Sequence, residues 1–159
     1  MTTRPTATRL PDGGWRITLP LAAVPSANLT TREHWSARNR RVSALATDLL
    51  WLLHYADAPR LHTVERHSRV GNVVMARQEA VVFDRARLAL TLYFPRRARR
   101  DPGNFGQGGG AKGLVDALVR AGWLADDDAA HLTCDEPRIA VDRERPRVEI
   151  ELHPWDGER

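Results

Sequence analysis

The chain has 159 residues, a length that predicts a single domain over residues 1–159 with an ordinary hydrophobic core. Its hydrophobic fraction of 42% and charged fraction of 28% are typical of globular proteins, and no apolar run reaches the roughly 20 residues of a membrane span. We therefore expect neither a membrane partner nor a wholly disordered chain. The first residues lack the apolar stretch of a secretory signal, and a lone Cys134 cannot form an intramolecular disulfide, so the expected location is cytoplasmic.

The charge balance favours a polyanionic partner. The formal net charge is +4, the sequence pI is about 10.1, and every basic residue except Lys112 is an arginine. Arginine pairs bidentately with phosphate, but a genome rich in G and C also replaces Lys by Arg throughout its proteins. Composition alone leaves both explanations open.

The amino-terminal part of the chain predicts a tail and then a strand. Residues 1–13 are expected to be a flexible tail that ends in the turn signal Pro11–Gly14. Trp15–Leu19 then alternates apolar and polar residues, which is the pattern of a half-buried strand.

A long amphipathic helix is predicted from Thr31 to about Tyr55, with apolar residues at steps of three and four. Arginines crowd its first half, where cations oppose the helix macrodipole and a bound phosphate would remove the conflict. The alternative is a solvated helical face. The candidate DNA-binding residues in this segment are Arg32, Arg38, Arg40 and Arg41.

Residues 56–80 show no sustained period and predict a mobile loop. The spacing of His54, His62 and His67 matches no zinc motif, so we expect surface roles for these histidines. A buried strand is predicted over Arg87–Phe94, and Pro95 ends it. The strand leads into a basic run that ends in a carboxylate, namely Arg96, Arg97, Arg99, Arg100 and Asp101.

A glycine-rich loop over residues 102–110 and a helix over Ala111–Ala121 follow this basic run. The glycines would let the backbone approach a phosphate, and Lys112 lies near the start of the helix. A nucleotide-binding P-loop is rejected, because the Ser or Thr that should follow the lysine is replaced by Gly113. No nucleotide cofactor is expected.

Three consecutive carboxylates, Asp126, Asp127 and Asp128, follow the helix. Adjacent carboxylates repel one another unless a cation or solvent screens them, and Mg²⁺ prefers such oxygen ligands. The plainer interpretation is a cap for the next turn. Asp135 is a reserve metal ligand, and Cys134 is expected to be a small buried residue.

These motifs together resemble the RusA family of Holliday-junction resolvases. The resemblance is carried by Arg99-Arg100-Asp101-Pro102-x-Asn104, Lys112-x-x-x-Asp116-Ala117-Leu118-x-x-Ala121-Gly122 and Asp126-Asp127, with weaker similarity at Pro25–Asn28, His34–Trp35 and Arg147–Leu152. Members of that family are homodimeric endonucleases, many of them from prophages, that nick four-way DNA junctions with aspartates and Mg²⁺.

The resemblance implies catalytic roles for Asp101, Asp127 and Lys112. It also implies that Asp101 and Asp127, with Asp126 or Asp128, bind Mg²⁺ or Mn²⁺, and that the arginines and Asn104 bind DNA. The family pattern Asp-x-Asp-Asn has lost its second carboxylate here, because Gly103 occupies that position. The interval between Asn104 and Lys112 is also longer than in the family, so the lysine reaches the site only if the loop folds back.

The remaining segments, His131–Val141 and Arg145–His153, predict two strands that pair as a hairpin, with Val148, Ile150 and Leu152 facing the core. The whole order predicts an α+β fold, a small mixed sheet covered by helices and similar to RusA. Three functions stay open: a metal-dependent endonuclease for branched DNA, a DNA-binding relative that does not cut, and an unrelated basic interaction module.

Overall fold

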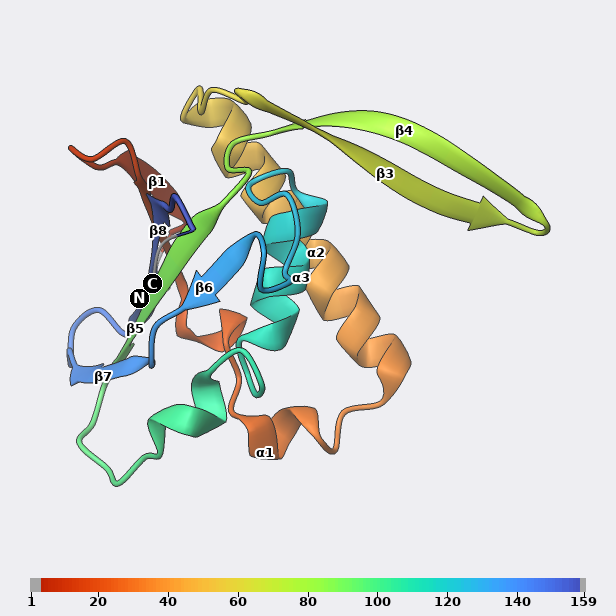
Figure 1. Cartoon of the computed structure of the whole chain (residues 1–159). Coiled ribbons are helices and arrows are strands. Elements are labelled where there is room, and N and C mark those ends of the chain that lie inside the picture. The colour runs from red at the N-terminus through yellow and green to blue at the C-terminus, as the bar shows by residue number, and fades with distance from the viewer. Residues whose placement is uncertain (1–3, 158–159) are drawn as a thin grey trace.

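Figure 1 shows the computed structural model of the chain, which describes residues 4–157. The helices are α1 (Ala27–Thr30), α2 (Trp35–Tyr55) and α3 (Lys112–Arg120), with 3-10 turns η1 (Leu21–Ala23) and η2 (Pro102–Phe105). The strands are β1 (Thr6–Arg9), β2 (Trp15–Pro20), β3 (His62–Val70), β4 (Val73–Val81), β5 (Ala86–Phe94), β6 (Leu132–Cys134), β7 (Arg138–Val141) and β8 (Arg147–Pro154).

Strand β5 is the centre of the main sheet. On one side it pairs antiparallel with β8, and β2 and β1 follow in that order. On the other side it pairs parallel with β6 near its start and with β7 near its end. The fold is therefore α+β with a mixed sheet, as the sequence predicts.

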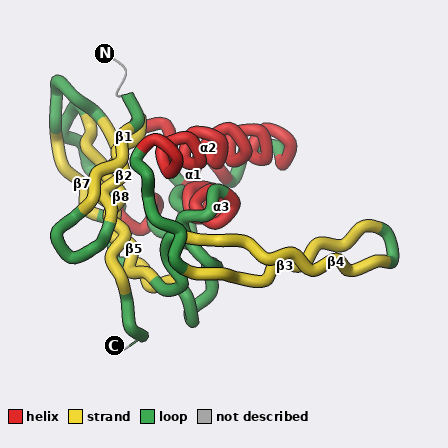
Figure 2. The backbone as a smooth tube through the Cα atoms, turned by 90° about the horizontal axis from the view of Figure 1, so that it is seen from above, coloured by secondary structure: helices red, strands yellow, loops and turns green. Residues whose placement is uncertain are grey.

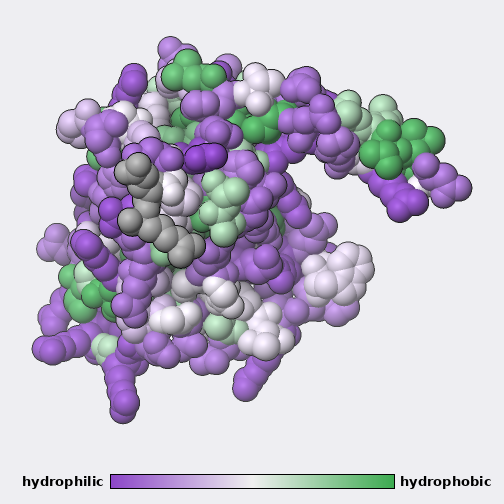
Figure 3. Space-filling model, viewed as in Figure 1, coloured by the Kyte–Doolittle hydropathy of each residue, from purple (hydrophilic) through white to green (hydrophobic). Residues whose placement is uncertain are grey.

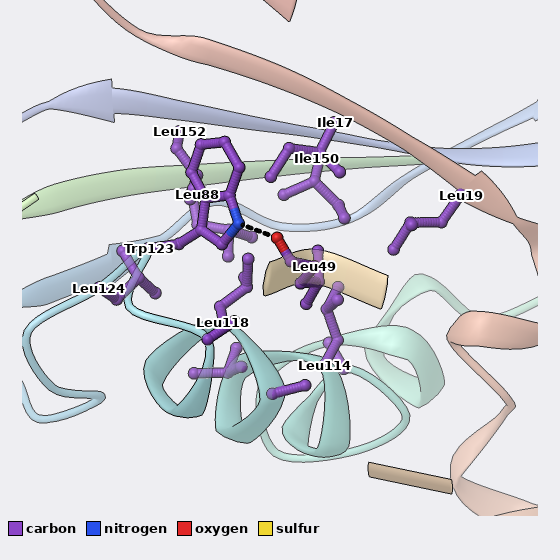
Figure 4. Packing of buried hydrophobic residues seen from close by; sticks show 14 of the residues in the cluster. Ile17, Leu19, Leu49, Leu88, Leu114, Leu118, Trp123, Leu124, Ile150 and Leu152 are labelled. Carbon is purple, nitrogen blue, oxygen red and sulfur yellow. Dashed lines mark hydrogen bonds between the residues drawn. The ribbon is translucent and has the colours of Figure 1, made fainter. Parts of the chain in front are cut away.

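One face of this sheet packs on α2 and α3. Because side chains alternate along a strand, β2, β5 and β8 each present every second residue to that face, and Ile17 and Ile150 there are fully buried. Leu49 of α2 and Leu118 of α3 meet them from the helix side. The Trp123 indole N–H donates to the Leu49 carbonyl at 2.9 Å and joins the end of α3 to α2 (Figure 4).

The predicted tail over residues 1–13 is wrong for the part that the structure describes, since residues 1–3 lie outside the described range. Thr6–Arg9 forms the edge strand β1, paired antiparallel with β2. The turn between them is closed by a hydrogen bond from the Leu10 N–H to the Gly14 carbonyl at 2.8 Å. Sequence analysis missed this strand because most of its residues are exposed, so it lacks the apolar alternation of a half-buried strand.

The loop predicted over residues 56–80 is also wrong. Most of this segment forms the antiparallel hairpin of β3 and β4, which pair with each other and not with the main sheet. Figures 1 and 2 show the hairpin projecting from the body on the side of α2 and α3. Both of its faces are largely exposed, so no apolar period marks it in the sequence.

The predicted hairpin of the last two strands is a third correction. Strands β7 and β8 both pair with β5 and lie on opposite sides of it. The core side of β8 is as predicted, since Val148, Ile150 and Leu152 are fully buried. In the part of the chain that the structure describes, no helix is both long and apolar enough to cross a membrane.

The long helix also begins later than its predicted start at Thr31. Helix α2 starts at Trp35, after the short α1 and a turn. His34 is the N-cap, and its ring Nδ1 accepts a hydrogen bond from the Ser36 N–H at 3.3 Å.

Candidate nucleic-acid interface

The candidate site begins where β5 ends. Pro95 stops the strand, and the basic run crosses an exposed loop to Asp101, the N-cap of η2. The Asp101 carboxylate accepts a hydrogen bond from the Gly103 N–H at 3.0 Å, which satisfies one of the free donors at the start of the turn. This bond holds one carboxylate oxygen of Asp101 beside Gly103.

A cavity of about 560 Å³ opens beside this turn. Arg99, Arg100, Asp101 and Asn104 line one wall of it. The segment after β2 also lines the cavity, with Ser26, Asn28 and Leu29 among its residues.

Arg100 is held in place at this cavity. Its guanidinium lies 3.8 Å from the centre of the Phe94 ring and donates to the Arg96 carbonyl at 3.1 Å. Phe94 in turn packs edge-on against Phe105, the buried last residue of η2. The Arg100 side chain is therefore positioned by Phe94 at the end of β5, which Phe105 of η2 supports in turn.

The glycine-rich loop packs through its backbone. A Cβ added to Gly110 would lie 1.7 Å from the Pro25 carbonyl oxygen, so only glycine permits this contact. The Gly110 N–H donates to the Asn104 carbonyl at 3.0 Å and closes the loop. Gly108, in contrast, faces open space. The loop is closed by these contacts, but Lys112 does not line the cavity beside Asp101.

A second cavity, of about 220 Å³, lies at the start of α3. Three cationic side chains line it, Arg38 and Arg41 from α2 and Lys112 from α3, together with the backbone of Gly108 and Gly109. Arg38 and Arg41 are more than 60 positions from Lys112 and the two glycines in the sequence, and the packing of α3 against α2 brings the two groups together.

Two carboxylates orient these cations. Asp116, one turn along α3, lies 4.0 Å from the Lys112 Nζ and 3.6 Å from the Arg38 guanidinium. Arg41 donates to Glu33 at 2.9 and 3.2 Å, and these hydrogen bonds lower the pKa of Glu33. The third guanidinium nitrogen of Arg41, Nη1, is buried and has no partner among the described residues.

The sequence did not single out Asp116 as a site residue. Its spacing of four from Lys112 on a predicted helix was the signal that could have found it.

The two cavities share α1 as a wall. Asn28 and Leu29 line the first cavity, and Ala27 and Thr30 line the second. Five cations therefore flank one short helix, while Asp101 lies on the rim of the first cavity. The exposed members of the predicted DNA-binding set that line neither cavity are Arg32, Arg40, Arg96 and Arg97.

The three consecutive aspartates form a turn that is separate from the first cavity. The Asp126 carboxylate accepts from the Asp127 N–H at 2.7 Å. Asp128 accepts from the Ala130 N–H and from the His131 ring, and these contacts lower the pKa of Asp128. Asp128 thus has the capping role that the plainer interpretation predicted.

The turn is tied to the glycine-rich loop by Gln107, whose side-chain amide donates to the Asp127 carbonyl at 3.2 Å. Gln107 was not among the predicted residues, and no local pattern marks it.

The donor chemistry fits a hydrated Mg²⁺ better than a closed cage. Asp101 and Asn104 supply hard oxygen atoms at one cavity, and Mg²⁺ is commonly held by one or two carboxylates, water and substrate phosphate. Among residues 4–157, no group of three or more His, Cys, Asp or Glu side chains is arranged to hold a metal ion. A bound phosphate would have to complete the coordination.

Asp135 and Cys134 lie away from this region. Asp135 forms a bidentate pair with Arg87 on the sheet, at 2.8 Å. Cys134 is half-buried rather than buried, and desolvation raises the pKa of its thiol to about 11, which makes it a poor nucleophile.

A scan of the sequence against protein-family models found no matching family, and a search of the curated proteins found no match either.

Proposed function

We propose that this protein binds branched DNA and hydrolyses its phosphodiester bonds with the help of Mg²⁺ or Mn²⁺, as a member of the RusA type. The observation that carries the proposal is the convergence of five cations on two cavities around α1, with Asp101 on the rim. A phosphate backbone is the polyanion that such a spread of fixed cations fits, because each guanidinium can pair with one phosphate.

In this proposal the two cavities hold neighbouring phosphates. Arg38, Arg41 and Lys112 bind one of them, and the buried Arg41 Nη1 gains the acceptor that it lacks within the protein. Arg99 and Arg100 bind the other beside Asp101. These contacts read charge and shape, so we expect little base specificity.

Asp101 and Asn104 would hold the metal ion at the first cavity. The turn of Asp127 lies outside that cavity, so its carboxylate would join the site only after a movement of the turn on DNA binding. The bound ion would polarise the scissile phosphate and acidify a water molecule. Lys112, at the second cavity, would neutralise the charge of the neighbouring phosphate. A homodimer would present two such sites to opposite strands.

The test is a cleavage assay on end-labelled four-way junctions with Mg²⁺ or Mn²⁺. We expect paired, symmetric nicks, lost in Asp101→Asn and in Asp127→Asn but kept in Asp48→Asn, which removes an exposed carboxylate of α2. Equal cleavage by all four proteins would show that another group, or a contaminant, is responsible.

A second candidate function is junction binding without cleavage. Gly103 favours it, since the carboxylate that the family pattern has at this position is missing. Tight junction binding without product under both metals would select this candidate. Equal affinity for junction and linear duplex would reject both.

A further inference from the structure

The hairpin of β3 and β4, which we call the arm, forms a separate two-stranded sheet that carries exposed apolar side chains. Its nine residue pairs run from His62–Val81 at the base to Val70–Val73 at the tip. An isolated two-stranded hairpin is marginally stable in water, so it needs an anchor. Arg66 is that anchor, because its guanidinium donates to the carbonyls of Leu124 and Ala125 on the body.

The anchor ties the arm to the aspartate turn. Leu124 and Ala125 immediately precede the aspartate turn that begins at Asp126. Arg66 also lies 3.4 Å from Glu79 on the neighbouring strand, which fixes the guanidinium in place. The arm and the turn are therefore held as one unit.

The tip of the arm is apolar and exposed. Val70, Val73, Val74 and Met75 are 57–67% accessible. Figure 3 shows apolar surface on the outer part of the arm. Exposed apolar side chains gathered at one place indicate a contact surface. Their position at the end of a projecting arm points to a target that the tip enters.

The register of the arm places charge directly behind this tip. On one face the pairs run Val70 with Val73, then Ser68 with Met75, then Arg66 with Arg77. Residues 66–78 contain three arginines and no carboxylate. The carboxylates of Glu65 and Glu79 lie nearer the body.

We propose that the arm enters the branch point of the DNA and places its apolar tip against unstacked bases. A two-stranded ribbon fits the major groove, and apolar side chains can wedge between base steps. Unstacking costs least where stacking is already interrupted, as it is at a junction. Arg69 beside the tip would meet a flanking phosphate, and Arg77, 3.3 Å from Glu79, would exchange that partner for another phosphate. This inference rests on the proposed function.

A second copy of the chain is a weaker fit to the same surface. Four aliphatic side chains cannot supply the roughly 1,200 Å² or more that a stable interface buries. Two outer arms that carry arginines and no carboxylates would also repel each other.

The experiment uses four-way junctions with 2-aminopurine, a base analogue that brightens on unstacking, at the branch point. The tip variant is Val70→Ser/Val73→Ser/Met75→Ser, and the control is Val141→Ser, an exposed valine of β7. We expect wild type and control to raise the fluorescence equally. The tip variant should abolish the rise and bind the junction about tenfold more weakly.

Anisotropy with the same junctions separates the possible failures. Junction binding by wild type without a fluorescence rise overturns the arm proposal and leaves the proposed function standing, whereas no preference for junction over duplex overturns both. The arm proposal is also overturned if the tip variant raises the 2-aminopurine fluorescence as much as wild type does. If sedimentation shows that the tip variant converts a dimer to a monomer, the tip is a subunit contact instead. Thermal unfolding of the tip variant checks that its body is intact.

Discussion

The outer face of the sheet and the region around α1 both carry many arginines, but they use them differently. On the sheet, Arg16 pairs with Glu151 at 2.6 Å, and Arg147 pairs with Asp142 and Glu149 at 2.6 and 2.7 Å. In the basic run after β5, Arg96, Arg97 and Arg99 have no carboxylate partner among the described residues. The basic run after β5 therefore offers its charge to a polyanion more freely than the sheet face does. At the second cavity, Arg38 and Arg41 share their charge with Asp116 and Glu33.

The largest effect is expected from the backbone contact that shapes the cationic region. Gly110→Ala places a methyl group on the Pro25 carbonyl, so the loop must move. We expect a loss of about 3 kcal/mol in the free energy of unfolding, at the upper end of overpacking effects, together with loss of junction binding. Gly108→Ala is the matched control, because nothing lies within 4 Å of its added Cβ. Chemical denaturation measures the free energy of unfolding, and fluorescence anisotropy measures junction binding. Equal stability and equal affinity of the two variants would contradict the packing of the loop.

The next effect tests the comparison directly with two double variants. Arg97→Gln/Arg99→Gln removes unpaired cations, and we expect roughly 10- to 100-fold weaker junction binding and a salt slope smaller by about two. Arg16→Gln/Arg87→Gln removes the same charge from the paired sheet face and should leave affinity and slope near the wild-type values. The comparison fails if the second variant weakens binding as much as the first.

A smaller effect, on metal dependence, is expected from a carboxylate introduced at Gly103, beside Asp101. A Cβ at Gly103 would lie 3.3 Å from an Asp101 carboxylate oxygen, so Gly103→Asp sets two carboxylates side by side after a small adjustment. A further oxygen ligand should lower the Mg²⁺ concentration for half-maximal cleavage by about tenfold. Gly108→Asp serves as the control for added charge. An unchanged midpoint would mean that the vacancy at residue 103 does not limit the site.

The smallest effect is on the pH dependence of stability, through His153 of β8 on the outer face of the sheet. Burial disfavours the charged form of His153, but hydrogen bonds to Asp12 at 2.5 Å and Glu151 at 3.2 Å outweigh it and raise the pKa of the imidazole. The stabilisation is therefore complete below the unfolded value of about 6.5 and is lost as pH rises through the folded pKa. We expect the free energy of unfolding to fall by less than about 1 kcal/mol over this pH interval, because the imidazole ring is partly exposed.

Denaturation of wild type and His153→Gln near pH 6 and near pH 8 checks this sign. Wild type should lose more of its free energy of unfolding than the variant over that interval. A wild-type protein that gains stability as pH rises, relative to the variant, would contradict the pairing.

The sequence predicted the elements whose burial is one-sided. Strands β2, β5 and β8 alternate because one face packs on the helices, and Gly122 ends α3 with a φ of 84°. The arm was missed because neither of its faces is buried. The pairing of β7 and β8 with β5 was missed because the local pattern of a strand does not specify its neighbours.

The same distinction applies to the candidate site. Asp101 and the basic run were predicted from their place at the end of a strand. The meeting of Lys112 with Arg38 and Arg41 depends on how α3 packs on α2, which no local spacing encodes. Asp128 was a candidate ligand by composition, and its contacts with the following turn are visible only in the structure.

The most direct test of the central claim is a salt titration of binding to a four-way junction and to a linear duplex of the same sequence. If the cations of the basic run and of the two cavities hold branched DNA, the junction binds more tightly, and the logarithm of affinity falls linearly with the logarithm of salt concentration, with a slope of about −4 or steeper. A slope near zero, or equal affinity for junction and duplex at every salt concentration, would contradict it.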